Sequence, residues 1–189
     1  MKNLFFLILI CFLSHSLMSQ LNGFIGSKDV ALYIGYENEI GAIAESNDCV
    51  AEVKATNASV KYLGNAKYTV IPDGNSRVCE ITLSCLDKGI VKVQRFGVKK
   101  IPPPVLRTSI ISGSRGGYLD AGLEDFWDLK GIKFQIISGL IDGKSFVGDL
   151  IPKDLTNHLA IGKEVTIDLK VKNLIDGRII DIQGKVLIK

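Results

Sequence analysis

The stretch Val78-Cys79-Glu80-Ile81-Thr82-Leu83-Ser84-Cys85 carries an apolar residue at every odd position and a polar one at 80, 82 and 84. Successive side chains of a β-strand point to opposite faces, so this alternation predicts a strand with one buried face. Cys79 and Cys85 then point into a core together with Ile81 and Leu83. This strand decides the class of the first half of the chain.

Similar short segments surround this strand, and turn residues separate them. The turns are Gly64-Asn65, Pro72-Asp73-Gly74-Asn75 and Asp87-Lys88-Gly89, whose residues accept positive φ or preset a bend. Further strands are expected at residues 30–34, 50–55, 59–63, 67–71 and 90–98. Such spacing predicts an immunoglobulin-like β-sandwich over residues 29–101, without a helix.

A second β domain is expected over residues 105–189. Its hairpin signals are Asp142-Gly143 and Asp176-Gly177, and its predicted turn is Gly113-Ser114-Arg115-Gly116-Gly117. One short helix is expected behind Pro152, where Leu155 and Leu159 lie four residues apart. Strands are predicted at residues 106–111, 132–138, 145–151, 165–174 and 178–188. The fold class is therefore mainly β, with two antiparallel β-sandwich-like domains, the second holding one short helix.

Pro102, Pro103 and Pro104 separate the two predicted domains. Proline fixes its own φ and restricts the residue before it, so a semi-rigid hinge over residues 102–104 is expected.

The N-terminus reads as a signal peptide over residues 1–19. Lys2 supplies a positive start, the apolar run spans Leu4 to Leu13, and Ser19 offers a small residue for cleavage. A membrane helix needs about 18 unbroken apolar residues, whereas this run meets Ser14 after about ten. We expect an exported protein, periplasmic or secreted, without membrane insertion after cleavage. Residues 20–28 are expected to be an N-terminal extension.

Three cysteines, Cys49, Cys79 and Cys85, remain after the leader. Cys79 and Cys85 are six residues apart in one straight strand, about 20 Å, and cannot bridge each other. Cys49 is therefore the partner in any intramolecular disulfide. The favoured pair is Cys49 with Cys79 and the alternative is Cys49 with Cys85, while three buried free thiols remain open.

The composition offers little for catalysis, metal binding or nucleic acids. The formal charge of +3 falls to +2 without Lys2 and is not clustered, so no nucleic-acid partner is expected. His158 is the only histidine beyond the leader, and its polar setting favours a surface residue over a triad or zinc ligand. The acidic group Glu124, Asp125 and Asp128 lacks a calcium-loop frame. No catalytic residue, metal or cofactor is expected, and the chain is not expected to be an enzyme.

Aromatic residues are the best candidates for partner contacts. Phe126 and Trp127 are adjacent, so in an extended segment one would be buried and the other exposed. Trp127 is the first candidate contact because tryptophan is enriched in binding hot spots, with Tyr118 and Tyr36 next. Burial of all three under loops is an open alternative. Free sheet edges offer a second mode, in which a partner adds a strand.

Several motifs follow one another along residues 29–189. They are Leu32-Tyr33-Ile34-Gly35-Tyr36-Glu37-Asn38, the junction Phe96 to Pro104, Gly116-Gly117, Leu123-Glu124-Asp125-Phe126-Trp127-Asp128-Leu129, Gly162-Lys163-Glu164-Val165 and Asp176-Gly177-Arg178. In this order they resemble the C-terminal periplasmic domains of the GldM family of gliding-motility and type IX secretion proteins. The chain departs from the family at Glu39, where proline is common, and in the cysteines.

The resemblance implies a protein-interaction role and homodimer formation. In the family a membrane helix and two more periplasmic domains precede this pair, where this chain has the leader, so only the distal binding role is expected here. An adaptor in gliding motility or type IX secretion is therefore the expected function. The alternative is a secreted effector or inhibitor that uses the same β domains on an unrelated protein.

Overall fold

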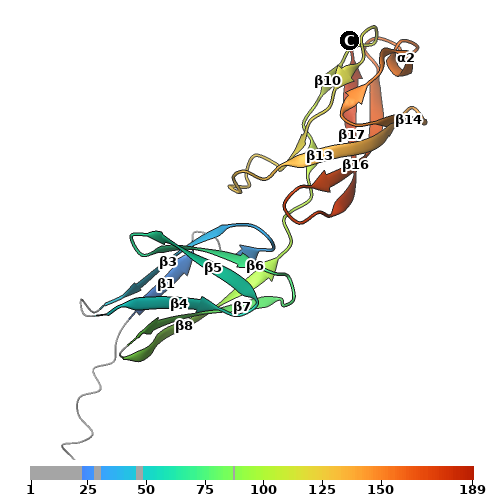
Figure 1. The fold of residues 1–189 in the computed structure, drawn as a ribbon. Helices are drawn as coiled ribbons and strands as arrows, with labels where there is room; N and C mark the ends of the chain where they lie inside the picture. Colours follow the sequence, from blue (N-terminus) through green and yellow to red (C-terminus); the bar gives the residue numbers. More distant parts are fainter. Residues whose placement is uncertain (1–22, 28–30, 46–48, 87) are drawn as a thin grey trace, which may run out of the picture. The chain divides into compact units, whose positions relative to one another are not determined.

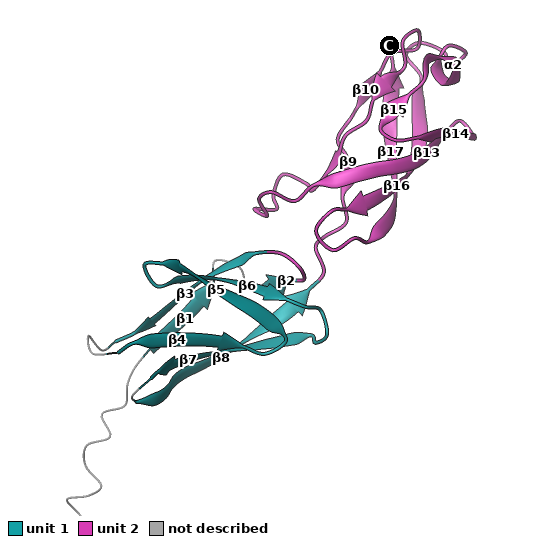
Figure 2. Cartoon of the chain, in the orientation of Figure 1, with its two compact units in different colours: residues 1–33, 37–99 teal, residues 34–36, 100–189 magenta. Residues whose placement is uncertain are grey.

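A computed structural model describes residues 23–27, 31–45, 49–86 and 88–189. The expected leader, residues 1–19, lies outside these described residues. The chain divides into two compact units (Figure 2): described residues up to Tyr33 with Glu37–Lys99, and Ile34–Tyr36 with Lys100–Lys189. Each unit is mainly β (Figure 1), as the sequence predicts. No helix in the described part of the chain is long and apolar enough to span a membrane.

The first unit is a sandwich of two four-stranded sheets. One has the order β1-β3-β6-β5 and the other β2-β8-β7-β4, with β2 parallel to β8. With β1 and β3 to β8 as strands A to G, these are the ABED and GFC sheets of an immunoglobulin domain. The strands are β1 (Gly23–Ser27), β2 (Ala31–Tyr33), β3 (Asn38–Ala44), β4 (Ala51–Ala55), β5 (Ala58–Gly64), β6 (Lys67–Pro72), β7 (Val78–Cys85) and β8 (Gly89–Lys99).

The alternation in β7 is confirmed in the core of this unit. Cys79, Ile81 and Leu83 are fully buried and Cys85 is 2% exposed. They pack against residues of the facing sheet, including Ile40, Ala42 and Val70. The sandwich therefore closes on the residues that the period-2 pattern selects.

Two strands of the first unit differ from the sequence prediction. Residues 20–28 are not merely an extension, because β1 pairs with β3 from Gly23↔Ala44 to Ser27↔Ile40. Strand β3 was not predicted, since Glu39, Gly41, Ala42 and Ala44 have low β propensity. Burial of Ile40 and Ala42 under the facing sheet outweighs that propensity.

The favoured disulfide was wrong and its alternative is observed. Cys49 bonds Cys85, with the Cα atoms 5.3 Å apart, and Cys79 is a buried free thiol. Strands β4 and β7 run antiparallel with Ala51 opposite Cys85, which brings the residues just before β4 to the end of β7. Cys79 lies at the other end of β7, opposite Phe96 of β8. Cys79 and Cys85 both point into the core, so only the register of β4 against β7 decides which of them bonds Cys49.

The second unit is built on a five-stranded sheet of order β10-β17-β16-β13-β14. Two small sheets, β11-β15 and β12-β9, complete it. Its elements are β9 (Val105–Leu106), β10 (Ile110–Ile111), β11 (Gly117–Tyr118), β12 (Ala121–Gly122), β13 (Phe134–Ile141), β14 (Lys144–Val147), β15 (Leu150–Ile151), α2 (Lys153–Thr156), β16 (Glu164–Asn173) and β17 (Ile179–Ile188).

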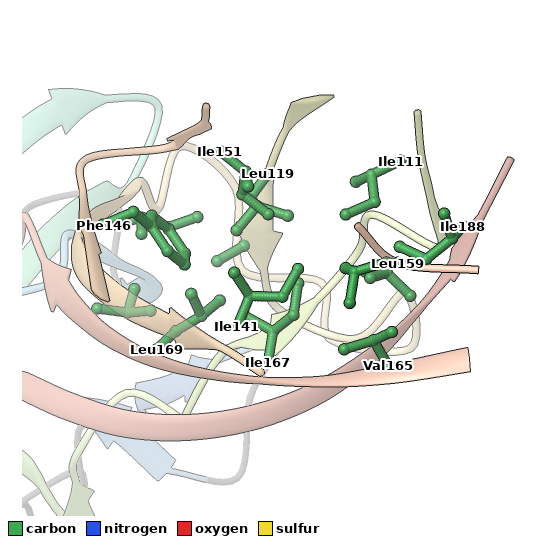
Figure 3. Packing of buried hydrophobic residues seen from close by; sticks show 14 residues of the cluster. Ile111, Leu119, Ile141, Phe146, Ile151, Leu159, Val165, Ile167, Leu169 and Ile188 are labelled. Carbon is green, nitrogen blue, oxygen red and sulfur yellow. The ribbon is translucent and has the colours of Figure 1, made fainter. Parts of the chain in front are cut away.

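The core of the second unit is rich in isoleucine and valine from β13, β16 and β17 (Figure 3). Ile141 and Ile167 are fully buried and meet Leu119 from the segment between β11 and β12, Ile151 from β15 and Leu159 from the segment after α2. The short helix and the Asp142-Gly143 hairpin are confirmed. The two expected strands over 106–111 and 145–151 are each broken in two, the latter at Gly148, which has a φ of +78°.

The boundary between the units lies two residues earlier than the predicted end of the first domain. Ile101 belongs to the second unit, where it is 1% exposed. Its carbonyl accepts a 2.7 Å hydrogen bond from Nη2 of Arg178, whose Nε lies 2.6 Å from the Asp176 carboxylate. The turn after β16 thus holds Ile101, the residue directly before Pro102, Pro103 and Pro104.

Candidate binding site

The three aromatic residues predicted as contacts lie in different settings. Tyr118 is 71% exposed in β11, and Trp127 is 37% exposed in the loop after β12. Tyr36 is half-buried in the segment 34–36. Trp127 lines a hollow of 750 Å³ in the second unit, and Leu119 and Asp120, which follow Tyr118, line it too. Tyr36 does not line this hollow.

The hollow combines an apolar base with a charged rim. Leu119, Ala121, Leu123, Leu129 and Ile136 line it and are all buried. Leu119, Ala121 and Ile136 also belong to the core of this unit, so the base of the hollow is the edge of that core. A volume of this size is within the usual range for ligand sites. We call it the Trp127 hollow.

Arg107 positions the loop that carries Trp127. Its Nη2 donates a 2.6 Å hydrogen bond to the carbonyl of Leu123, and lies 3.8 Å from Oδ1 of Asp125. The guanidinium lies against Gly122, where a Cβ atom would come within 2.5 Å of it. Any side chain at Gly122 would therefore displace Arg107 from the loop. The sequence prediction missed both residues, because neither belongs to a motif and only the pairing of β9 with β12 brings them together.

Phe126 and Trp127 do not face opposite sides, contrary to the expectation for an extended segment. The Trp127 amide donates a 3.0 Å hydrogen bond to the Glu124 carbonyl, so the segment is a turn. The two rings lie 5.1 Å apart at their centroids, tilted by 38°. Phe126 is 71% exposed. The two aromatic rings are therefore neighbours on the same loop, and Trp127 is the one that lines the hollow.

His158 and Cys79, whose residue types serve in many catalytic and metal sites, do not line this hollow. His158 faces Asp142, with Nε2 3.3 Å from Oδ2, and both are partly exposed. Cys79 is fully buried in the first unit, where burial and, secondly, Asp73 raise the pKa of its thiol. The described ranges contain no group of three or more His, Cys, Asp or Glu side chains placed to hold a metal ion. The turn 112–116 closes on itself, Ser112 and Gly116 exchanging both backbone hydrogen bonds.

Neither a protein-family model nor a curated protein matches this chain. Solved structures similar to it include the N-terminal four Ig domains of Dscam1 isoform 6.9, at 11% identity and a TM-score of 0.36, covering 90% of this chain and 53% of that one. Fibronectin(III)-like modules of Clostridium thermocellum CbhA match at 15% identity and a TM-score of 0.29, and the match covers 88% of this chain and 94% of that one.

The SGBP-B protein of the Bacteroides ovatus mixed-linkage glucan utilization locus, solved with a mixed-linkage heptasaccharide, matches at 16% identity and a TM-score of 0.33, covering 87% of this chain and 46% of that one. This chain thus spans about half the length of the Dscam1 structure. The strand order of the first unit independently gives the immunoglobulin-like fold. Fold alone does not assign a function, so a functional assignment has to come from the chemistry of the Trp127 hollow.

Proposed function

We propose that this chain is an exported, non-catalytic protein-binding module that receives its partner at the Trp127 hollow. The observation that carries the proposal is the combination of an apolar base, an exposed Phe126–Trp127 pair and a 750 Å³ opening in one β unit. Buried apolar pockets rimmed by polar groups and flanked by tryptophan are the usual anchors of protein interfaces.

The finer proposal is an adaptor in the gliding-motility or type IX secretion apparatus, at the periplasmic face or outside the cell. Its support is the ordered set of motifs shared with the GldM family. Two of those motifs have structural tasks in this chain: Asn38 links Tyr33 to Val70, and Arg178 holds the Ile101 carbonyl. Each of these contacts joins segments within one unit of this chain, and the choice of partner rests on the resemblance.

Affinity capture from envelope extract tests this proposal. The bait is the full mature chain, compared with Trp127→Ala and with Ile161→Ala, a control in the same unit that removes an 81% exposed apolar residue away from the hollow. We expect secretion or motility components with the wild type and Ile161→Ala, and their loss with Trp127→Ala. Recovery of no envelope-machinery component would overturn the adaptor, and capture of another protein would favour a secreted effector or inhibitor.

A further inference from the structure

This inference rests on the proposed function and specifies the partner. We infer that the Trp127 hollow takes a basic segment of a protein, with a lysine or arginine side chain placed beside Trp127. The observations behind it are the charge of the rim, the pairing of the charged groups there, and the aromatic pair on the loop.

The rim of the hollow carries more carboxylates than cations. Its lining holds the four acids Asp120, Glu124, Asp125 and Asp149, and the two bases Arg107 and Lys133, which gives 2 − 4 = −2. The whole chain is formally +3, so this negative charge is local. A cationic segment would therefore be attracted to this rim and not to the molecule as a whole.

Three of these carboxylates have no hydrogen-bond or ion-pair partner among the described residues. The side chains of Asp120, Glu124 and Asp149 make no hydrogen bond or ion pair with any other part of the chain that the structure describes. Arg107 does not neutralise them, since its guanidinium is held by the Leu123 carbonyl and lies near Asp125. Two other exposed acids of this unit are paired, Asp181 with Lys170 and Glu164 with Lys185.

The aromatic pair and the apolar base suit the rest of such a side chain. A cation over the face of tryptophan is attracted by the ring, most strongly where water is partly excluded. The methylene groups of lysine or arginine pack on apolar surface while the charged head stays near carboxylates. Trp127 lines the hollow together with the buried Leu123 and Leu129, and the Phe126 ring lies 5.1 Å from the Trp127 ring. A neutral sugar would gain from the rings but not from the charge.

The probe is a labelled lysine–serine repeat peptide, followed by fluorescence anisotropy with the full mature chain. We expect saturable binding that weakens as salt rises, and none of a glutamate–serine peptide of equal length. Asp120→Asn with Asp149→Asn keeps the shape and should weaken binding roughly two- to thirtyfold. Trp127→Ala should weaken it roughly tenfold or more. Asp154→Asn, an exposed carboxylate of α2 outside the hollow, is the matched control and should bind as the wild type does.

Circular dichroism of each variant confirms that the fold is retained, so that a loss of binding is a property of the rim. Equal binding of the lysine peptide by the wild type and the double Asn variant would overturn the inference. Preference for the glutamate peptide or for a neutral β-glucan oligosaccharide would also overturn it. The inference and the proposed function can fail separately. If envelope capture depends on Trp127 but not on Asp120 and Asp149, the binding module stands and the basic segment does not.

Discussion

In this protein a single polar side chain can link, by hydrogen bonds, segments that are distant in the sequence. Asn38 is 2% exposed; its Oδ1 accepts from the Tyr33 amide at 2.7 Å, and its Nδ2 donates to the carbonyls of Tyr33 and Val70 at 3.0 Å each. It thereby ties β2 of one sheet to β6 of the other. A buried amide with this many partners is costly to remove, because its partners are left without hydrogen bonds.

We expect Asn38→Ala to lower the free energy of unfolding by about 2–4 kcal/mol, since buried backbone groups of Tyr33 and Val70 lose their partners. Urea unfolding of the first unit measures the change. Asn75→Ala is the control. Asn75 is exposed, and among the residues that the structure describes its side chain bonds only Asp73, two positions earlier, so a loss within about 0.5 kcal/mol is expected there. Equal losses in the two variants would contradict the bridging role.

The buried thiol of Cys79 predicts a decline in stability at alkaline pH. Burial, and secondly Asp73, raise its pKa above the ordinary 9.0, so the thiol ionises more readily in the unfolded chain. The stability that the protonated, buried thiol contributes to the folded state is fully present below pH 9.0 and is lost as the pH rises through the folded-state pKa. Tyr68, whose pKa is raised by burial and then by Tyr62, adds a loss above pH 10.0.

Comparison of the wild type with Cys79→Ala across this range isolates the thiol. Pulse proteolysis after brief denaturation suits the measurement, because short exposure limits exchange between this thiol and the disulfide. The wild type should lose more stability than the variant between neutral pH and the region above pH 9.0. Parallel curves would show that the thiol does not contribute.

Among the strands, the pairing register decides where the disulfide forms and where a glycine is required. The register of β4 against β7 sets the disulfide, and the register of β13 between β14 and β16 sets a close approach at Gly139. Gly139 lies opposite Phe146 on one side and Leu169 on the other. Both constraints come from neighbours in the sheet, so a change at either site tests the pairing itself.

The Cys49–Cys85 bond closes a loop of 36 residues in sequence separation. Chain-entropy estimates give a loss of about 3–4 kcal/mol when such a cross-link is removed. We expect Cys49→Ala with Cys85→Ala to show this loss in urea unfolding, and reduction of the wild type to act in the same direction. Cys79→Ala keeps the bond and should leave the effect of reduction in place. If reduction does not change the stability, the bond does not cross-link the folded unit as described.

Gly139→Ala should destabilise the second unit by about 1–3 kcal/mol, through overpacking. A Cβ there would lie 2.8 Å from the Asp168 carbonyl, 2.4 Å from Phe146 and 2.7 Å from Leu169. Gly97→Ala is the matched strand control, because a Cβ at Gly97 meets nothing within 4 Å. Thermal unfolding of both variants is the measurement, and a neutral Gly139→Ala would argue against this pairing of β13.

At the scale of the molecule, the chain holds two cores that share no residue. The first contains Cys79, Ile81 and Leu83, and the second contains Ile141, Ile167 and Val171. Ile167→Ala should cost the second unit about 2–5 kcal/mol, by lost burial and the cavity left behind. Hydrogen exchange should show the loss in β13, β16 and β17, with protection in β7 and β8 unchanged. Equal loss in both sets of strands would mean that the two cores unfold together.

Periodicity was sufficient to locate most of the fold. Strand β7 has the predicted limits, β16 and β17 lie within one residue of theirs, and the short helix begins after Pro152 as expected. Strand β3 was not predicted, because its glycine and alanines have low β propensity and because its burial depends on the facing sheet. The candidate site was found only in part: Trp127 by residue type, but Arg107 and Gly122 only through the pairing of β9 with β12.

Local patterns in the sequence were enough to establish the β class of this protein, its division near the three prolines, and the inward phase of Cys79 and Cys85. These are local properties, since alternation and turn residues act over a few positions along the chain. Tertiary structure alone decided which cysteine bonds Cys49, and that Phe126 and Trp127 share one side of a loop held by Arg107. Both depend on strand register and on contacts between distant segments, and no short-range pattern encodes either of these.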